Sequence, residues 1–329
     1  MKEIAMLVLP DDAQHDYPLL EALVEDDDLG QIVLTLARAM VPLSARLAAG
    51  KLPGDLAALV GENDSGDAQK ALDVGAHDHV MAALKGANIR HVLSEEAALP
   101  SCLDPEGDWD LVIDPIDGSG SIGIGAPLGM LFAIYPAGSG DFLRAGREAV
   151  AAGYASFGHS LDFGYSLGDG VHIATYDAQS NAFHVTLAKV MLPDQAKVIA
   201  YNASNERHWP AGLQAYVNDL RLGKTGPRGR DFNMRWLAAA VGELHRIILK
   251  GGAFLYPQDA RKGYENGRLR LTYEAVPIAF LMEQAGGRAS NGARDILDLV
   301  PKEVHEFVPL IFGASEEVAL IEDYLAKNN

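Results

Sequence analysis

Residues 31–85 show the periodicity of two amphipathic helices. Apolar side chains recur every three or four positions over 31–49 and again over 67–85, with Asp73 beside the second stripe. This spacing predicts a helix over each range, the first kinked at Pro42. Residues 1–30 contain nine acidic side chains and one lysine, which predicts an irregular arm before the first helix.

Between about residues 90 and 190 the pattern changes to short apolar or alternating runs separated by turn residues. Such runs predict the strands of one sheet with helices packed on it. The runs are IRHVLS, DLVIDP, MLFAIYP, AAGYASFG, GVHIATYD and AFHVTL.

The last third of the chain alternates between helical and strand patterns. Residues 231–250 predict a helix, AFLYP (253–257) and LRLTYE (269–274) predict strands, and VPIAFLMEQAGG (276–287) predicts a further helix. We therefore expect two lobes, 1–195 and 196–329, in a layered α/β fold.

The composition is that of a globular protein with a strong acidic excess. Of the 329 residues 48% are hydrophobic, and 27 Lys and Arg against 45 Asp and Glu give a formal net charge of −18. A chain of this length can bury a large core. Its charge argues against binding to nucleic acid or to an anionic membrane and favours the attraction of cations.

The single cysteine, Cys102, excludes an intrachain disulfide, which favours a reducing cytoplasm. The apolar run at the N-terminus is shorter than that of a signal peptide, and acidic residues follow it. Continuous apolar segments stay well below the about 20 residues of a membrane-spanning helix. We therefore expect a cytoplasmic protein.

Three groups of acidic residues follow predicted strands. Glu95 and Glu96 follow IRHVLS, Asp114 and Asp117 follow DLVI, and Glu274 ends LRLTYE. Ligand crevices in open α/β sheets lie at strand ends, and hard cations such as Mg²⁺ bind carboxylate and phosphate oxygens. The pattern predicts a centre for two or more Mg²⁺ or Mn²⁺ ions.

The run IDPIDGSGSIG (113–123) indicates this chemistry most clearly. A solvated turn in an acidic protein is the alternative interpretation. Such a turn does not require a strand before it, a proline between two carboxylates and a loop of small residues after it. Small residues let backbone N–H groups close on a phosphate, so the run predicts a metal site that also holds phosphate.

The run DLVIDPIDGSGSI resembles the signature of the lithium-sensitive sugar and inositol phosphatase superfamily, and its context resembles the class I fructose-1,6-bisphosphatase family. The supporting stretches occur in order from about residue 31 to the C-terminus. They are QKALDV, SEE, IDPIDGS, AAGYASFG, GGAFLYP, GRLRLTYEAVPIAFLMEQAGG and ILDLVP.

The resemblance implies a two-lobed α/β/α/β/α sandwich and dependence on Mg²⁺ or Mn²⁺. It implies hydrolysis of the 1-phosphate of fructose 1,6-bisphosphate to give fructose 6-phosphate, in gluconeogenesis or the Calvin cycle. It also implies a homo-oligomer, by resemblance a tetramer.

The resemblance also assigns roles to residues of the candidate centre. The metal ligands would be Glu95, Glu96, Asp114, Asp117, Glu274 and the backbone carbonyl of Ile116. Asp73, with Glu96, would orient the attacking water or act as its base, and Asp67 is a further catalytic candidate. Asp117 and the backbone amides of Gly118, Ser119 and Gly120 would hold the 1-phosphate.

A second phosphate requires a second anion site. Residues 221–235 form a basic island with Arg221, Lys224, Arg228, Arg230 and Arg235. Arginine suits phosphate because its planar group donates two hydrogen bonds at once. A basic loop paired with the acidic surface is the alternative interpretation.

By resemblance, the 6-phosphate would be bound by Asn202, Tyr256 and Arg268, and by Arg235 reaching into a neighbouring subunit. Trp236 replaces the family's usual tyrosine, Arg268 its usual lysine, and Ala240 a larger apolar residue. The change to Trp236 removes a hydroxyl donor to phosphate, the change to Arg268 keeps the charge with another geometry, and the smaller Ala240 implies a wider sugar pocket.

Several alternatives remain open. The same chemistry could act on sedoheptulose 1,7-bisphosphate, or on both sugars. More distant alternatives are an inositol monophosphatase, a nucleotide 3′-phosphatase, or a non-catalytic anion-binding relative that has lost a ligand carboxylate. The five carboxylates at Glu95, Glu96, Asp114, Asp117 and Glu274 argue against the last of these.

Two regulatory properties of related enzymes are not expected. AMP inhibits many relatives at a turn that opens the first helix, and here that turn carries Asp26, Asp27 and Asp28. Asp108, Trp109 and Pro136 occupy the positions at which those relatives place cations and a tyrosine. Carboxylates there would repel the AMP phosphate, and with Cys102 alone no disulfide switch can form.

Overall fold

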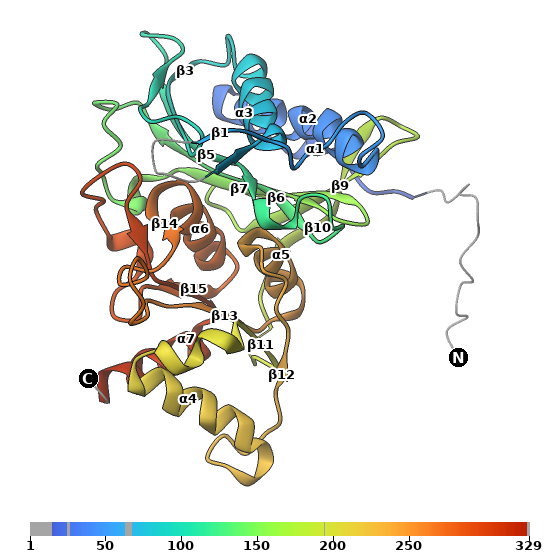
Figure 1. Cartoon of the computed structure of the whole chain (residues 1–329). Coiled ribbons are helices and arrows are strands. Elements are labelled where there is room, and N and C mark those ends of the chain that lie inside the picture. Colours follow the sequence, from blue (N-terminus) through green and yellow to red (C-terminus); the bar gives the residue numbers. More distant parts are fainter. Residues whose placement is uncertain (1–14, 25–26, 63–67, 194, 328–329) are drawn as a thin grey trace, which may run out of the picture.

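The computed structural model describes residues 15–24, 27–62, 68–193 and 195–327. Within these ranges the chain forms five layers, in which two sheets alternate with three layers of helices (Figure 1). This is the α/β/α/β/α sandwich that the sequence predicts.

The larger sheet is built by the first half of the chain. Its strand order is β10-β9-β8-β7-β6-β5-β3-β4, and β3 and β5 are parallel while the other neighbours are antiparallel. The strands are β3 (Ile89–Ser94), β4 (Ser101–Cys102), β5 (Trp109–Asp117), β6 (Leu128–Pro136), β7 (Ala151–Phe157), β8 (Leu161–Ser166), β9 (Val171–Asp177) and β10 (Ala182–Val190).

Helices α2 (Asp28–Ala48) and α3 (Ala71–Ala83) cover the outer face of this sheet. Their apolar stripes pack on the strands, and Leu36, Met40 and Ala76 are fully buried. The same half contains α1 (Leu20–Leu23), β1 (Leu59–Glu62), β2 (Ala68–Lys70) and the 3₁₀ turns η1 (Ser119–Ser121) and η2 (Gly146–Glu148).

The second half of the chain builds a smaller sheet of order β12-β11-β13-β17-β15. Its strands are β11 (Val198–Tyr201), β12 (Asn233–Met234), β13 (Ala253–Tyr256), β15 (Gly287–Ser290) and β17 (Leu310–Ala314). The strands β14 (Leu269–Arg270) and β16 (Phe307–Val308) form a separate antiparallel pair. The 3₁₀ turns here are η3 (Ala203–His208), η4 (Gly223–Thr225) and η6 (Ile296–Asp298).

The middle layer separates the two sheets. Helices α5 (Ala240–Lys250) and α6 (Val276–Gln284) pack on β6 and β7 of the larger sheet, and α6 also contacts β15 and β17 (Figure 1). Helices α4 (Ala211–Leu222) and α7 (Ser315–Lys327) form the last layer. Apolar side chains fill each interface between layers, so burial of apolar area holds the sandwich together.

Of the described helices, α2 has the length and mean hydropathy that would allow it to cross a membrane. In this structure its apolar side chains pack against the protein core and not against lipid. Ile32, Val33, Leu36 and Met40 are fully or almost fully buried in the core beneath the larger sheet, and α2 contacts β7, β8 and α3. Packing in the core accounts for its apolar character.

The structure corrects several expected boundaries. The helix predicted over 67–85 begins at Ala71, because β2 precedes it, and α2 runs on through Pro42 to Ala48. Part of the expected irregular arm forms α1, and α2 begins at Asp28. In the run LRLTYE only Leu269–Arg270 is strand, and Leu271–Ala275 is a π-helical turn.

The helix predicted over 231–250 begins only at Ala240. Two local features explain the late start. The backbone N–H of Arg235 donates to the Ile199 carbonyl at 3.1 Å, which continues the pairing of β12 with β11. Ala238 has a left-handed backbone with φ of 62°, which cannot continue a right-handed helix.

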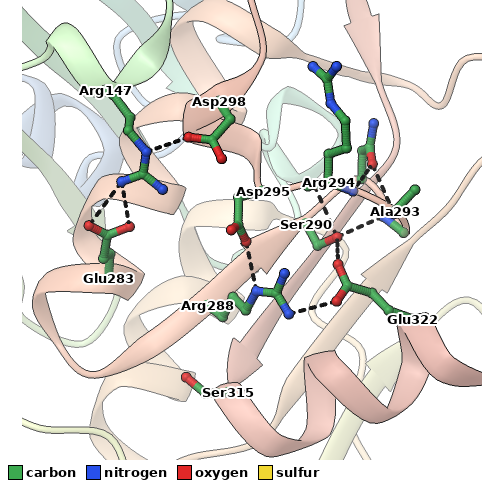
Figure 2. A network of polar contacts seen from close by, with 12 residues as sticks. Arg147, Glu283, Arg288, Ser290, Ala293, Arg294, Asp295, Asp298, Ser315 and Glu322 are labelled. Carbon is green, nitrogen blue, oxygen red and sulfur yellow. Dashed lines mark hydrogen bonds and ion pairs between the residues drawn. The ribbon is translucent and has the colours of Figure 1, made fainter.

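Polar contacts also connect the two halves of the chain. Arg147, in η2 of the first half, donates to Glu283 on α6 at 3.1 Å and to Asp298 in η6 (Figure 2). In the second half, Arg288 on β15 lies 2.6 Å from Glu322 on α7. These surface pairs are exposed or half-exposed, so each adds little to stability alone.

Candidate active site

Acidic side chains from three segments of the chain come together at the candidate site. Asp114 and Asp117 lie at the end of β5, and Glu274 lies in the π-helical turn after β14. One carboxylate oxygen from each lies within 4.8 Å of the others. Glu95 directly follows β3, which is the parallel neighbour of β5. The last residue of β3, Ser94, pairs with Ile113 of β5. The predicted carboxylates therefore come from adjoining elements.

The backbone around Pro115 explains how β5 presents two aspartates. The pairing of β5 with β6 shifts in register between Asp114 and Asp117, because proline has no N–H to donate to a ladder. The Ile116 N–H donates instead to the Asp114 carboxylate at 2.8 Å. Asp114, the first aspartate, thus orders its own loop.

Asp117 also connects the centre to α5. Its Oδ2 accepts a hydrogen bond from the Val241 N–H at 2.6 Å, at the helix N-terminus where anions are favoured. The next residue, Gly118, has φ of 84°, and a Cβ there would lie 2.6 Å from the Ala239 side chain. Only glycine fits this close approach.

The Glu274 side chain is held by its own turn. Its Oε2 accepts from the Arg270 N–H at 2.5 Å, which closes the turn that the strand prediction missed. The buried Arg270 guanidinium lies 3.6 Å from the Phe307 ring centroid and donates to the His305 carbonyl at 2.8 Å. Arg270 therefore lies beside the carboxylates without neutralising them all.

Burial and mutual repulsion raise the pKa values of these carboxyl groups. Burial raises the pKa of Glu95 to about 7 and that of Asp117 to about 6. Burial and neighbouring carboxylates raise the pKa values of Asp114 and Glu274 well above their usual range. Such groups are costly to ionise unless a cation joins them. An all-oxygen donor set of this kind fits Mg²⁺ or Mn²⁺.

The cluster opens into a cavity of about 340 Å³. The carboxylates of Glu95, Glu96 and Glu274 line it together with Asp73. Burial raises the pKa of Asp73, and its Oδ1 is buried without a hydrogen-bond partner among the described residues. An unpaired buried oxygen in a polar cavity is suited to a water or an ion. The other lining residues are Gln69, Lys70, Ile116, Ser119, Gly120, Arg268, Arg270 and Phe307.

Sequence reasoning missed three polar residues of the cavity, and also Phe307. Gln69 donates to the Glu96 carboxylate at 2.6 Å, Lys70 donates to the Ser119 carbonyl, and Arg270 adjoins Glu274. Gln69 and Lys70 stand within the quoted run QKALDV, and Arg270 within GRLRLTYE. Their polar side chains beside predicted site residues, Asp73 in one stretch and Glu274 in the other, were the available signal.

Of the residues expected around a second phosphate, Arg268 lines the cavity, whereas Arg235 is exposed outside its lining. The Arg268 guanidinium carbon lies 5.1 Å from the Phe307 ring centroid. Burial raises the pKa of Tyr256, and Arg268 counters part of that rise. The Asn202 side chain accepts from the Ser204 N–H at 3.1 Å. Arg235 is exposed on the segment before α5.

Trp236, which replaces the family's usual tyrosine, lies on the segment between Arg235 and α5. Its ring stacks on Phe254, with 5.6 Å between ring centroids and 9° between the planes. It also contacts Tyr256 at a centroid distance of 6.0 Å. The wall beside Tyr256 is thus aromatic.

Most of the basic island is paired with acidic side chains. Arg228 and Arg230 lie 2.8 and 3.2 Å from Glu317. Arg221 lies 3.1 Å from Glu206, and Lys224 lies 2.9 Å from Asp231. For Arg221, Lys224, Arg228 and Arg230, the alternative of a basic loop paired with acidic groups is the better description.

The predicted catalytic residue Asp67 falls outside the described residues.

Comparisons with known proteins agree with this geometry. The model of the fructose-1-6-bisphosphatase N-terminal domain matches residues 22–188, and that of the C-terminal domain matches 192–326. The class 1 fructose-1,6-bisphosphatase of Brucella anthropi is 53% identical over 286 residues, which span 87% of this chain and 84% of that protein. The corresponding protein of Brucella suis is 52% identical over equal shares. The crystal structure of Leishmania major fructose-1,6-bisphosphatase in holo form superposes with a TM-score of 0.87 and 26% identity, covering 94% of this chain and 99% of that one.

Proposed function

Because this chain belongs to the class 1 fructose-1,6-bisphosphatase family, we propose that it hydrolyses the 1-phosphate of fructose 1,6-bisphosphate to give fructose 6-phosphate and phosphate. The observation that carries the proposal is the group of buried carboxylates with raised pKa values beside the loop at Gly118. Burial and mutual repulsion raise these pKa values, and a bound cation would stabilise the ionised groups.

Mg²⁺ or Mn²⁺, two or more per site, would be held by Glu95, Glu96, Asp114, Asp117, Glu274 and the Ile116 carbonyl. When bound, such ions neutralise charge on the phosphate and lower the pKa of a bound water. The residues fit because every donor is oxygen and because Asp114, Asp117 and Glu274 already lie within 4.8 Å of one another.

The remaining cavity residues orient the reactants. Asp73 lines the cavity, and its buried Oδ1 has no hydrogen-bond partner among the described residues, so we expect it to hold the attacking water together with Glu96. Gln69 fixes the Glu96 carboxylate. The amides of Gly118, Ser119 and Gly120 would hold the 1-phosphate, and Lys70 steadies that loop through the Ser119 carbonyl.

Arg268, Tyr256 and Asn202 are proposed for the 6-phosphate, with Arg235 supplied to a neighbouring subunit. Arg235 supports this last role because it is exposed and, unlike Arg228 and Arg230, has no ion pair with an acidic group in the described part of the chain. The proposal therefore includes a homo-oligomer, by family resemblance a tetramer. We also place the lobe boundary near residue 195, between β10 and β11.

We further propose that AMP does not bind. Asp27 caps α2 by accepting from the Gly30 N–H at 2.7 Å. Asp28 and Asp108 converge on one side chain, since the Asn88 amide donates to both, at 2.6 and 3.1 Å. Arg144 lies nearby but is 3.0 Å from Asp110 and donates to the Pro136 carbonyl. Asp26 falls outside the described residues.

A cytoplasmic location completes the proposal, and Cys102 supports it, being exposed and free as a reducing compartment allows. The deciding experiment measures phosphate release with Mg²⁺ from fructose 1,6-bisphosphate, sedoheptulose 1,7-bisphosphate, inositol 1-phosphate and a nucleotide 3′-phosphate. We expect the fructose ester to have the highest kcat/KM. A higher value for the seven-carbon sugar would change the substrate but keep the chemistry, and Ala240 is the feature that favours it. A preference for either monophosphate would overturn the proposal.

A further inference from the structure

A second group of metal-ligating side chains lies at the opposite edge of the larger sheet. His15, Asp177 and His184 each present one donor atom, and the three atoms lie within 4.8 Å of one another. Asp177 ends β9, and His184 lies in β10, the edge strand. His15 belongs to the segment before α1. Distant parts of the sequence therefore meet at this point.

Strand pairing explains how the three side chains come together. Asp177 pairs with Ala182, two residues before His184, so Asp177 and His184 share one face of the sheet. The segment before α1 pairs with the outer edge of β10, because the Val185 N–H donates to the Pro18 carbonyl at 2.8 Å. This pairing brings the His15 ring to a centroid distance of 4.4 Å from His184.

The hydrogen bonds of His184 prepare one ring nitrogen as a ligand. Its Nδ1 lies 3.1 Å from the Tyr17 carbonyl, which can only accept, so Nδ1 carries the hydrogen. In the neutral ring Nε2 then has the lone pair, and it lies 3.0 Å from the Ser180 Oγ. A ring N–H that donates to a backbone carbonyl is the usual support of a metal-binding histidine.

Asp177 is held as a carboxylate in the same turn. The N–H groups of Gln179 and Ser180 each donate to it at 2.9 Å. Hydrogen bonds from Ser180, with those from the turn amides, lower the pKa of Asp177 to about 2. An ionised carboxylate has lone pairs beyond those that accept these bonds.

We propose that His15, Asp177 and His184 bind one divalent cation of the Zn²⁺ class, with water completing the coordination. Two imidazoles and one carboxylate suit Zn²⁺, whereas the oxygen donors of the active site suit Mg²⁺. Ligand bonds of about 2.0–2.2 Å place tetrahedral donors about 3.4 Å apart. The donors must close slightly, which the exposed His15 side chain permits.

The cation would fasten the segment before α1 to the β9–β10 hairpin. It would do so far from the catalytic centre. Five strand steps separate β10 from β5, which at about 4.8 Å per step is roughly 24 Å. The two metal sites can therefore be tested separately.

The test is equilibrium dialysis of Zn²⁺ against the full-length protein in excess Mg²⁺. We expect one bound Zn²⁺ per chain that resists the Mg²⁺, and at least a tenfold loss of its affinity in both His15→Ala and His184→Ala. The matched control is His159→Ala, which removes another exposed histidine. Ser180→Ala is expected to bind Zn²⁺ at least as tightly as the parent, because the single hydrogen of the Ser180 hydroxyl is donated either to Asp177 or to Nε2 of His184 and competes with the cation for that ligand.

Two further variants and a second readout separate the possible outcomes. Asp114→Asn must retain this Zn²⁺; its loss there would place the ion in the catalytic centre and overturn the proposal. Equal affinity in His15→Ala and the parent would also overturn it. Zn²⁺ should slow proteolysis before α1 in the parent and in His159→Ala, but not in His15→Ala. Protection in all three proteins would contradict the site.

Discussion

Two groups of buried charge in this chain are arranged in opposite ways. In the active site, the carboxylates of Asp114, Asp117 and Glu274 face one another, and burial raises the pKa of each. Arg270 offsets part of this at Glu274. The like charges nonetheless remain in excess.

In the first turn of α7 a single buried carboxylate is surrounded by partners. The buried Glu317 accepts from the Tyr216 hydroxyl at 2.6 Å, and it lies 2.8 and 3.2 Å from Arg228 and Arg230. The Arg228 guanidinium also packs 4.7 Å from the Phe232 ring centroid. Here the protein supplies every counter-charge itself.

The comparison shows how buried charge divides between stability and function. A carboxylate with its own cations holds two elements together, and removing one partner leaves an uncompensated charge. Carboxylates without enough cations weaken the empty protein but create a binding site for an ion. Sequence position alone does not separate the two kinds, because both consist of acidic residues beside apolar runs.

The largest expected effect follows from removing charge at the active site. Asp117→Asn should lower turnover at least about a thousandfold, or roughly 4 kcal/mol, because it removes a metal ligand beside the reacting phosphate. Steady-state phosphate release measures this, with Asp323→Asn on the exposed face of α7 as the control. A loss below tenfold would mean that Asp117 serves mainly to cap α5.

The opposite behaviour is expected at Glu317. Glu317→Ala should lower the free energy of unfolding by about 3–5 kcal/mol, since Arg228 would stay buried without its counter-charge. Urea unfolding gives this value, and Glu316→Ala, at the exposed neighbouring position, should change it little. Activity per folded molecule should remain near that of the parent. A stable but inactive Glu317→Ala would break the division between the two groups.

Arg235 carries a positive charge that no acidic group of the described chain neutralises, and its removal is the next test. Arg235→Ala should raise KM for the bisphosphate while leaving kcat nearly unchanged, since a charge-assisted hydrogen bond contributes about 1.5–3 kcal/mol. Arg221→Ala is the control, because Arg221 is paired with Glu206. An unchanged KM for Arg235→Ala, or a fully active monomer by size-exclusion chromatography, would remove Arg235 from the shared site.

The smallest expected effect is that of AMP. Asp27, Asp28 and Asp108 lie together at the start of α2, and like charges at 4 Å repel by about 4 kcal/mol at an effective dielectric constant of about 20. Millimolar AMP should leave activity unchanged at saturating Mg²⁺. Cooperative inhibition at micromolar AMP would show that the cluster does not exclude an anion.

Sequence reasoning predicted the layered fold and the main carboxylates because these depend on local patterns. The strands carry continuous apolar runs, and Asp114 and Asp117 stand in a compact motif. It failed where the structure depends on the hydrogen-bond or ion-pair partner of a single polar side chain. The turn at Glu274 forms because that side chain accepts from the Arg270 N–H, although LRLTYE has the composition of a strand.

The two interpretations of the basic island could not be separated from the sequence for a similar reason. Arg230 pairs with Glu317, which lies 87 residues further along the chain, and spacing cannot reveal such a partner. The late start of α5 depends on the left-handed backbone of Ala238, an alanine that by propensity favours helix. The backbone pairing of residues 233–235 with β11 precedes this alanine and delays the helix.

The most direct test of the central claim titrates Mg²⁺ into chelated protein while activity and thermal unfolding are followed together. Without metal, the parent should be inactive, and Asp114→Asn should unfold at a higher temperature than the parent. The sign follows because burial and neighbouring carboxylates raise the pKa of Asp114 above its unfolded value, so ionised Asp114 destabilises the fold near neutral pH.

Mg²⁺ should then restore activity to the parent alone and raise its unfolding temperature more than that of Asp114→Asn. Full activity of the parent in chelator, or equal stabilisation of both proteins by Mg²⁺, would contradict the claim that these buried carboxylates form a metal centre.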